Sequence, residues 1–256
     1  MASQIHHPEK SAIALVLTFT AGSVDIVGYL SAYHTFVAHM TGTTVHLGNA
    51  LFNREAGNAA LSAMILALFI CGSLVGRAIV EIGARHKIRS IASLTLGIEA
   101  VLLTIVASQA LGGFISGDAP HYPKVMLGLL ATAMGLQTAT ITRVGALTVH
   151  TTFVTGMINK LCQLVSQIIF DTYDIATANS ASLERCRTHR AMTVRGALFI
   201  FAIWACYVAG AIGGTWLQSR WQLRGLYLPV ALLCLAIATD QFVPLSIEEE
   251  KDQAER

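Results

Sequence analysis

The chain has 256 residues, of which 54% are hydrophobic and only 12% are charged, and its mean hydropathy is +0.60. A soluble domain carries about 25% charged residues, so this composition excludes an ordinary soluble protein and predicts a polytopic α-helical membrane protein. The net charge of +2 gives no reason to expect a nucleic-acid partner, and the sequence contains neither a Walker-type phosphate loop nor a dinucleotide-binding fingerprint.

Six apolar segments have the length and composition of membrane spans. The first contains Asp25 and is too long for the apolar part of a signal peptide, so we expect it to be retained. Polar or turn-rich sequence separates the segments, and the longest such separator covers residues 171–195. The expected spans cover residues 11–33, 59–82, 90–111, 124–142, 196–217 and 225–244.

These segments predict a single transmembrane domain over residues 11–244. A polar N-terminal tail, residues 1–10, precedes it, and a charged C-terminal tail, residues 245–256, follows it. Within the domain we expect two structural repeats, one over residues 11–111 and the other over residues 124–244.

The repeats are suggested by a Thr-Gly motif that occurs in both halves. Thr41-Gly42 and Thr155-Gly156 each follow an apolar segment and lead into another helical one, 114 residues apart. Spans 2 and 5 also share a pair of glycines four residues apart, a spacing that permits close helix packing in membranes. These pairs are Gly72 with Gly76, and Gly210 with Gly214.

The basic residues predict the topology. The loops at residues 85–89 and 185–195 are the richest in Lys and Arg, so both should be cytoplasmic. This requires three net crossings in each half and makes the repeats inverted, with cytoplasmic termini. Each Thr-Gly segment is then a broken or re-entrant helix rather than a full span. The alternative, eight full spans, would place one basic loop outside.

Four short runs give the chain a resemblance to a known family. They are Ala21–Tyr29, Phe36–Gly42, Gly135–Gln137 and Thr151–Gly156. With these runs the sequence resembles, across residues 11–244, the YoaK-type family of bacterial inner-membrane proteins, which consist of one domain of unknown function. The resemblance implies a membrane fold and an inner-membrane location, but no substrate or reaction.

Two acidic residues lie inside expected spans. Asp25 is well within span 1, and Glu99 is near the middle of span 3. A carboxylate at the centre of a bilayer costs about 2.5–3.5 kcal/mol on insertion scales, so it needs a partner or a function. Both are candidates for binding a coupling proton or cation. The alternative is structural: a hydrogen bond to a neighbouring helix for Asp25, and an ion pair or hydrogen bond for Glu99.

The Thr-Gly motifs are the main candidates for a substrate site. Glycine permits backbone geometry that other residues avoid, and a threonine hydroxyl can replace a lost backbone hydrogen bond. A helix interrupted at Thr41-Gly42 or Thr155-Gly156 would expose N–H groups that attract anions, or carbonyl groups that attract cations. The alternative is close packing of small residues against a neighbouring helix.

Other polar residues flank these motifs. His39 and His46 are seven residues apart, about 10 Å along a helix, which is too far for both to bind one metal ion, so we expect no metal site. A proton relay or a polar lining is the better interpretation. In the second half, Lys160 could offset Asp25 or Glu99 or bind an anionic substrate, although it could also extend to the membrane surface. The remaining polar candidates are Asn49, Gln137 and Asn159.

These features favour a secondary transporter for a small molecule or ion, with the site between two inverted repeats. The alternatives are an intramembrane enzyme, for which no compact catalytic motif is present, and a scaffold that binds other membrane proteins. We expect contact with the lipid bilayer, an unknown substrate, no cofactor and no nucleic acid, and a homo-oligomer is possible. The five cysteines are widely spaced and are expected to remain reduced.

Overall fold

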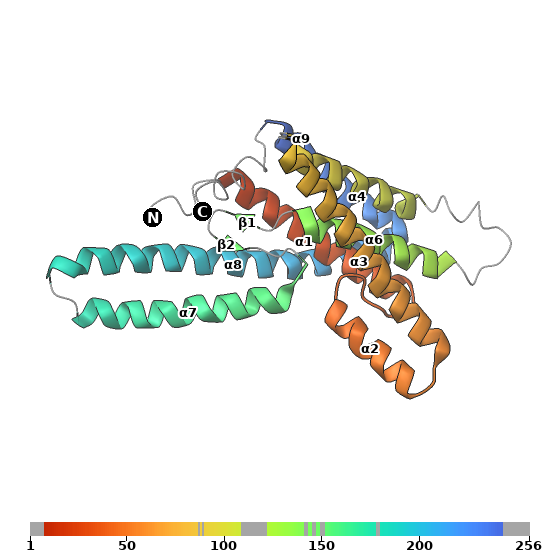
Figure 1. Cartoon of the computed structure of the whole chain (residues 1–256), viewed down its shortest axis with the longest axis horizontal. Coiled ribbons are helices and arrows are strands. Elements are labelled where there is room, and N and C mark those ends of the chain that lie inside the picture. Colours follow the sequence, from red (N-terminus) through yellow and green to blue (C-terminus); the bar gives the residue numbers. More distant parts are fainter. Residues whose placement is uncertain are drawn as a thin grey trace.

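The computed structural model of the chain describes residues 8–86, 88, 90–108, 122–140, 143–144, 147–148, 152–177 and 180–242, and these residues form an α-helical bundle (Figure 1). The predicted charged tail lies outside the described residues. In chain order the elements are α1 (Pro8–Ser31), α2 (Met40–Phe52), α3 (Ala56–Arg85), α4 (Ile91–Ala107), α6 (Tyr122–Thr140), β1 (Arg143–Val144), β2 (Leu147–Thr148), α7 (Val154–Thr177), α8 (Ser180–Trp221), the 3₁₀ helix η1 (Gln222–Leu226) and α9 (Tyr227–Phe242).

The helices have the length and composition of a polytopic membrane bundle, as the sequence predicts. Within the described residues, three helical stretches are long and apolar enough to cross a membrane: Lys10–Ser31, Ala56–Arg85, and Leu183–Gln241, in which η1 separates α8 from α9. Ile91–Ala107 is a shorter apolar helix. Large apolar side chains on the outside of the bundle, including those of Leu74 and Ile212, are more than half exposed, as expected of residues that face lipid.

Two pairs of helices pack through glycines. A Cβ atom on Gly22 of α1 would overlap the carbonyl oxygen of Tyr207 in α8, and one on Gly210 would overlap that of Phe19. The predicted glycine pairs therefore serve packing within the chain, because only glycine lets the backbones approach this closely. The second pair is α6 with α3. Here a Cβ atom on Gly135 would overlap the carbonyl oxygen of Phe69, and one on Gly72 would overlap that of Thr132.

These contacts also fix the directions of the helices. Gly210 packs on Phe19, and Gly214, one turn later in α8, packs on Ser23 and Ile26, so α1 and α8 run parallel. The same comparison shows that α6 and α3 run parallel. In contrast, α1 and α6 run antiparallel. Residues late in α1 meet residues early in α6 and the reverse: Leu17 accepts a hydrogen bond from Gln137, and Gly28 lies against Leu130.

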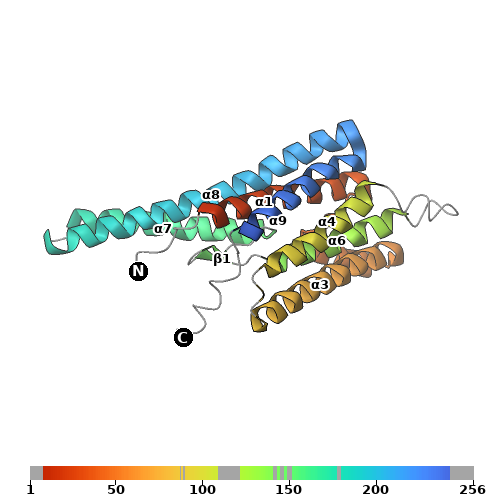
Figure 2. The ribbon, with the colours of Figure 1, turned by 90° about the horizontal axis from the view of Figure 1, so that it is seen from above.

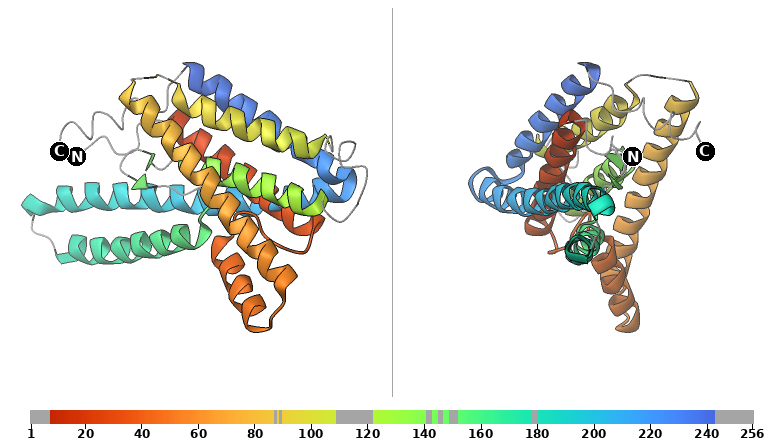
Figure 3. Two further views of the ribbon diagram at one scale, coloured as in Figure 1. Left: turned by 45° about the vertical axis from the view of Figure 1, so that its right-hand side comes forward. Right: turned by 90° about the vertical axis from the view of Figure 1, so that its left-hand side faces the viewer.

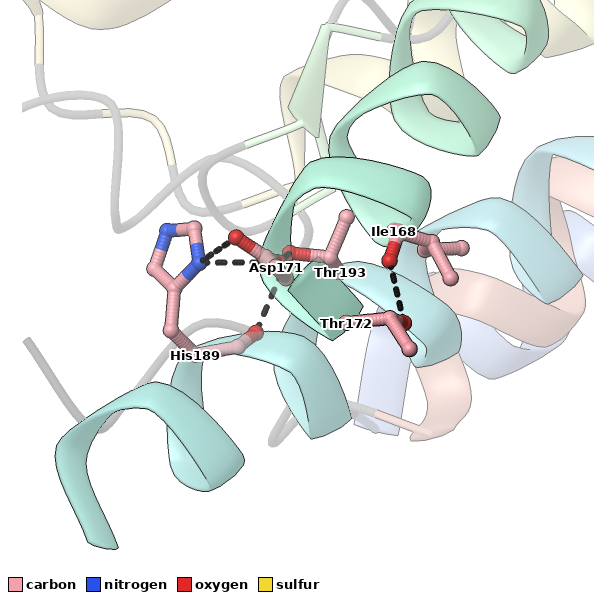
Figure 4. A network of polar contacts seen from close by, with 5 residues as sticks. All are labelled: Ile168, Asp171, Thr172, His189 and Thr193. Atoms are coloured by element: carbon pink, nitrogen blue, oxygen red, sulfur yellow. Dashed lines mark hydrogen bonds and ion pairs between the residues drawn. The ribbon is translucent and has the colours of Figure 1, made fainter. Parts of the chain in front are cut away.

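The chain from residue 171 to residue 195 is mostly helical, and its prediction as a polar loop is wrong. The end of α7 and the start of α8 form an antiparallel hairpin that projects from the bundle (Figures 1 and 3). Asp171 joins the two helices, because its carboxylate lies 3.0 Å from His189 Nδ1 and accepts a hydrogen bond from Thr193 (Figure 4). The charged residues that suggested a loop are therefore the exposed face of paired helices.

The centre of the bundle is formed by α1, α4, α6 and α9, which lie together when the molecule is viewed from above (Figure 2). Asp240, near the end of α9, holds the start of α4 by accepting hydrogen bonds from the N–H and the hydroxyl of Ser93. This contact satisfies an N–H group that the first turn of a helix leaves without a partner. The largest fully buried side chains of these four helices are Leu17, Leu96, Leu103, Leu127, Leu130, Met134, Leu136 and Leu233.

Candidate functional site

A cavity of about 670 Å³ lies where the two helix pairs meet. Its wall includes the first residues of both α2 and α7, which come from different halves of the chain. Volumes of this size are typical of sites for small molecules. The lining residues are Gly22, Asp25, Ile26, Phe36, Ala38, His39, Met40, Thr41, Phe69, Thr138, Thr152, Phe153, Val154, Thr155, Tyr207 and Ala211.

Asp25 connects three segments at this cavity. One carboxylate oxygen accepts hydrogen bonds from the backbone N–H groups of Val37 and Ala38, both 2.8 Å away. The other accepts a hydrogen bond of 2.8 Å from the hydroxyl of Tyr207 in α8. The side chain is 4% exposed. Asp25 therefore holds the segment before α2 against α1 and α8, and hydrogen bonding to a neighbouring helix is part of its role.

The chain must reverse sharply to bring these N–H groups to Asp25. Tyr33 and His34, directly after α1, both adopt left-handed backbone conformations, with φ of 52° and 46°. Such conformations are uncommon for residues other than glycine. The ring of Tyr29 stacks on that of Phe36, with centroids 4.6 Å apart, which holds the returning segment against α1.

In the second half, Thr138 of α6 lies in the position that Asp25 has in α1. Its hydroxyl is 2.7 Å from the hydroxyl of Thr152, in the segment that leads into α7. The two halves thus use the same arrangement, in which a polar side chain in the long helix holds the segment before the short helix. The first half uses a carboxylate and the second a hydroxyl.

The structure places the helix interruption before each Thr-Gly motif rather than at the motif. Helix α2 begins at Met40 and α7 at Val154, so each threonine and glycine lies in the first turn. A Cβ atom on Gly42 would overlap the ring of His39, and one on Gly156 would overlap the ring of Phe153. Each glycine therefore accommodates the aromatic ring three residues earlier.

The other predicted site residues lie in various places. Asp25, His39, Thr41 and Thr155 line the cavity, and the remaining predicted residues do not. His46 and Asn49 are exposed on α2, and His39 lies directly before this helix. The residues outside the cavity lining are Gly42, His46, Asn49, Glu99, Gln137, Gly156, Asn159 and Lys160.

Glu99 is fully buried in α4. Neither of its carboxyl oxygens has a hydrogen-bond partner among the described residues. Lys160 forms no salt bridge with Glu99 or Asp25 in the part of the chain that the structure describes, so the alternative in which it offsets one of these carboxylates is not realised there. Gln137 is also buried, and its amide donates a hydrogen bond of 2.6 Å to the carbonyl oxygen of Leu17.

Sequence reasoning missed several lining residues. Tyr207 was not identified, although the spacing that relates Gly72 to Gly210 also relates Phe69 to Tyr207. In the same way, the spacing that relates Gly22 of α1 to Gly135 of α6 also relates Asp25 to Thr138. Within the described residues, no three His, Cys, Asp or Glu side chains are grouped so that they could hold a metal ion.

Comparisons with known proteins identify the family of the chain. The chain is 29% identical over 161 residues to the UPF0700 transmembrane protein YoaK of Bacillus subtilis (strain 168), and this match covers 63% of the chain and 69% of the relative. No solved structure matches the chain. The family described as protein of unknown function DUF1275 matches residues 13–239. The resemblance to YoaK-type membrane proteins is thereby confirmed, and the chain belongs to the DUF1275 family.

Proposed function

We propose that this protein is a secondary transporter for a small molecule, with the cavity as its substrate site. The observation that carries the proposal is that matched positions of the two halves line one cavity: Thr41 with Thr155, His39 with Phe153, and Phe69 with Tyr207. Transporters built from inverted repeats place the substrate at the interface of the repeats, beside interrupted helices.

The helix directions support inverted repeats. Helices α1 and α6 occupy matched positions and run antiparallel, and each packs parallel to the long helix of the other half. In this arrangement α1, α3, α4, α6, α8 and α9 alternate in direction and supply six crossings, while α2 and α7 make none. Movement of one half against the other would then open the cavity to alternate sides of the membrane.

The orientation follows from the basic residues. Because α8 runs parallel to α1, the start of α8 lies on the same side as the start of α1. Helix α3 runs parallel to α6 and therefore antiparallel to α1, so the end of α3 lies on this side too. This side carries Arg85 and the arginines of early α8, so it is the cytoplasmic side by the positive-inside rule. Both termini are then cytoplasmic, and the membrane is the bacterial inner membrane.

Glu99 is the candidate for a coupling group. A fully buried carboxyl group without a partner is costly, and in membrane transporters such groups take up and release protons. Because Glu99 does not line the cavity, proton binding there would act on the substrate site through α4 and its neighbours.

Cysteine accessibility tests the transporter proposal without knowledge of the substrate. Thr41→Cys and Thr155→Cys, each in a protein whose five natural cysteines are replaced, are treated with a membrane-impermeant maleimide in right-side-out and in inside-out vesicles. Alternating access predicts that both positions react from both sides. Labelling of both positions from a single side would contradict it.

Two controls define the sides of the membrane in the same experiment. Cys186, retained as the only cysteine, lies in early α8 and should react only in inside-out vesicles. Asn53→Cys, at the end of α2, should react only in right-side-out vesicles. The reverse result for both controls would overturn the proposed orientation.

A further inference from the structure

We propose that the cavity binds an organic cation, with the ammonium group against Asp25 and the surrounding aromatic rings. This inference rests on the proposed function, because it names the substrate class of the same site. It is carried by three features of the cavity: its charged lining, its aromatic lining and the way in which Asp25 is held.

The charged lining favours a positive ligand. Among the lining residues that the structure describes, Asp25 is the only acidic one, and none is a lysine or arginine. Within the described residues no lysine or arginine forms a salt bridge with Asp25. An anionic ligand would therefore lie near a carboxylate, and His39 is the one basic side chain in the described part of the lining that could offset it. A cationic ligand would supply the missing counter-charge.

The first turns of α2 and α7 also face the cavity, and helix N-termini attract anions. At α2 the protein supplies that anion itself, because Asp25 accepts hydrogen bonds from the N–H groups of Val37 and Ala38, just before the helix. At α7 the matched position holds Thr138, which is neutral and bonded to Thr152. The carboxylate of Asp25 thus makes the lining favour a cation despite the N-termini of α2 and α7.

The aromatic lining favours an organic cation over an inorganic one. A bulky ammonium group is stabilised by the faces of aromatic rings, whereas a metal cation needs several oxygen ligands. One oxygen of Asp25 already accepts two N–H groups, and the other accepts the hydroxyl of Tyr207. The carboxylate oxygens of Asp25 are thus already occupied by protein donors, which leaves this side chain little capacity to coordinate a metal ion. The rings that line the cavity belong to Phe36, Phe69, Phe153 and Tyr207.

The test compares choline with an uncharged and an anionic ligand of similar shape, and adds a larger aromatic cation. Choline and benzyltrimethylammonium are the cationic probes, dimethylbutanol is the uncharged carbon isostere of choline, and dimethylbutyrate is an anion of similar shape. Affinities for the purified protein in detergent are measured by calorimetry up to millimolar concentrations. We expect at least one cation to bind the wild type, and neither dimethylbutanol nor dimethylbutyrate to bind.

Asp25→Asn removes the charge and can keep the fold. The amide oxygen can accept the N–H groups of Val37 and Ala38, and the amide nitrogen can donate to the oxygen of Tyr207. We expect this variant to bind the cation about tenfold more weakly or worse, since a desolvated charge contact is lost. Phe69→Leu, which leaves these hydrogen bonds intact, should also weaken binding.

Asp171→Asn is the matched control. Asp171 also carries a hydrogen-bonded carboxylate, but it lies in the α7–α8 hairpin and does not line the cavity, so binding should be unchanged. Binding of neither cation to the wild type, or equal binding by Asp25→Asn, would overturn the inference.

A second variant separates this inference from the proposed function. If dimethylbutanol or dimethylbutyrate binds and Thr41→Val with Thr155→Val abolishes that binding, the cavity is the site but its ligand class is wrong. If a cation binds and neither Asp25→Asn nor the double variant weakens its binding, the cavity is not the site and both proposals fail.

Discussion

The two halves of the molecule share their packing and differ in their chemistry. Glycines at matched positions join α1 to α8 and α6 to α3, with the same backbone atoms in contact. The residue that holds the segment before the short helix is Asp25 in one half and Thr138 in the other. Packing thus sets the frame of the cavity in both halves, and the lining side chains, above all the charge of Asp25, distinguish them.

Enlarging the packing glycines should have the largest effect. Gly22→Leu and Gly135→Leu would each force a side chain into a backbone carbonyl of the partner helix, in α8 and α3 respectively. The backbone cannot give way as a flexible side chain does, so we expect a loss at or above the upper end of the about 1–3 kcal/mol typical of overpacking. Both variants should lose the monodisperse peak on size-exclusion chromatography.

Gly97→Ala is the control for this prediction. Gly97 lies in α4, and a Cβ atom there would meet no atom of another described residue within 4 Å. The change should leave the protein intact, because alanine favours a helix over glycine by about 1 kcal/mol. If Gly22→Leu were tolerated while Gly135→Leu was not, the two helix pairs would not be equivalent.

Asp25 and Thr138, which hold the segments before the two short helices, should contribute differently to the free energy of unfolding. Asp25→Ala leaves two N–H groups and one hydroxyl without their acceptor, and each buried donor left unpaired costs about 1–3 kcal/mol, so we expect a loss of about 3 kcal/mol or more. Thr138→Val removes one hydroxyl pair and should cost about 1 kcal/mol. Thermal unfolding in detergent measures both. Equal losses would mean that the additional hydrogen bonds of Asp25 add nothing to the stability of the fold.

The sequence predicted the features that depend on local composition. The apolar segments indicated the spans, and the glycine pairs of α3 and α8 indicated close helix packing, because both signals lie within a single helix. Partners from distant segments could not be predicted in this way. Tyr207 is 182 residues from Asp25, and only the parallel packing of α1 and α8 brings them together.

The errors of the sequence analysis have a common physical cause. Charged residues are expected both in loops and on exposed helix faces, so the composition of residues 171–195 did not distinguish a loop from paired helices. In the same way, polar residues next to a motif can face either the cavity or the outside. His46 and Asn49 lie on the exposed side of α2, although Thr41 in the same helix lines the cavity.

Exchange of the aromatic residues at matched positions should lower the stability less than Asp25→Ala does. Tyr207→Phe makes this position of α8 resemble Phe69 in α3 and removes the hydrogen bond to Asp25, for an expected loss of about 1.5 kcal/mol. The reciprocal change, Phe69→Tyr, adds a hydroxyl beside the cavity and should change the stability by less than about 0.5 kcal/mol. Thermal unfolding of the two variants and of the double variant shows whether the halves respond independently.

The smallest effects on stability should come from two serines, each of which connects the two helices of one pair. Ser23 of α1 donates a hydrogen bond of 2.9 Å to the carbonyl oxygen of Gly210, and Ser73 of α3 donates one of 3.2 Å to that of Gly135. Hydrogen bonds between membrane helices contribute about 0.6 kcal/mol on average, so Ser23→Ala and Ser73→Ala should each cost about that amount. Unfolding in mixed detergent measures both losses. Because the two hydrogen bonds lie in different helix pairs, the loss of stability in the double variant should equal the sum of the two single losses. A loss clearly larger than the sum would show that the halves stabilise each other across the cavity, and that its two walls do not move independently.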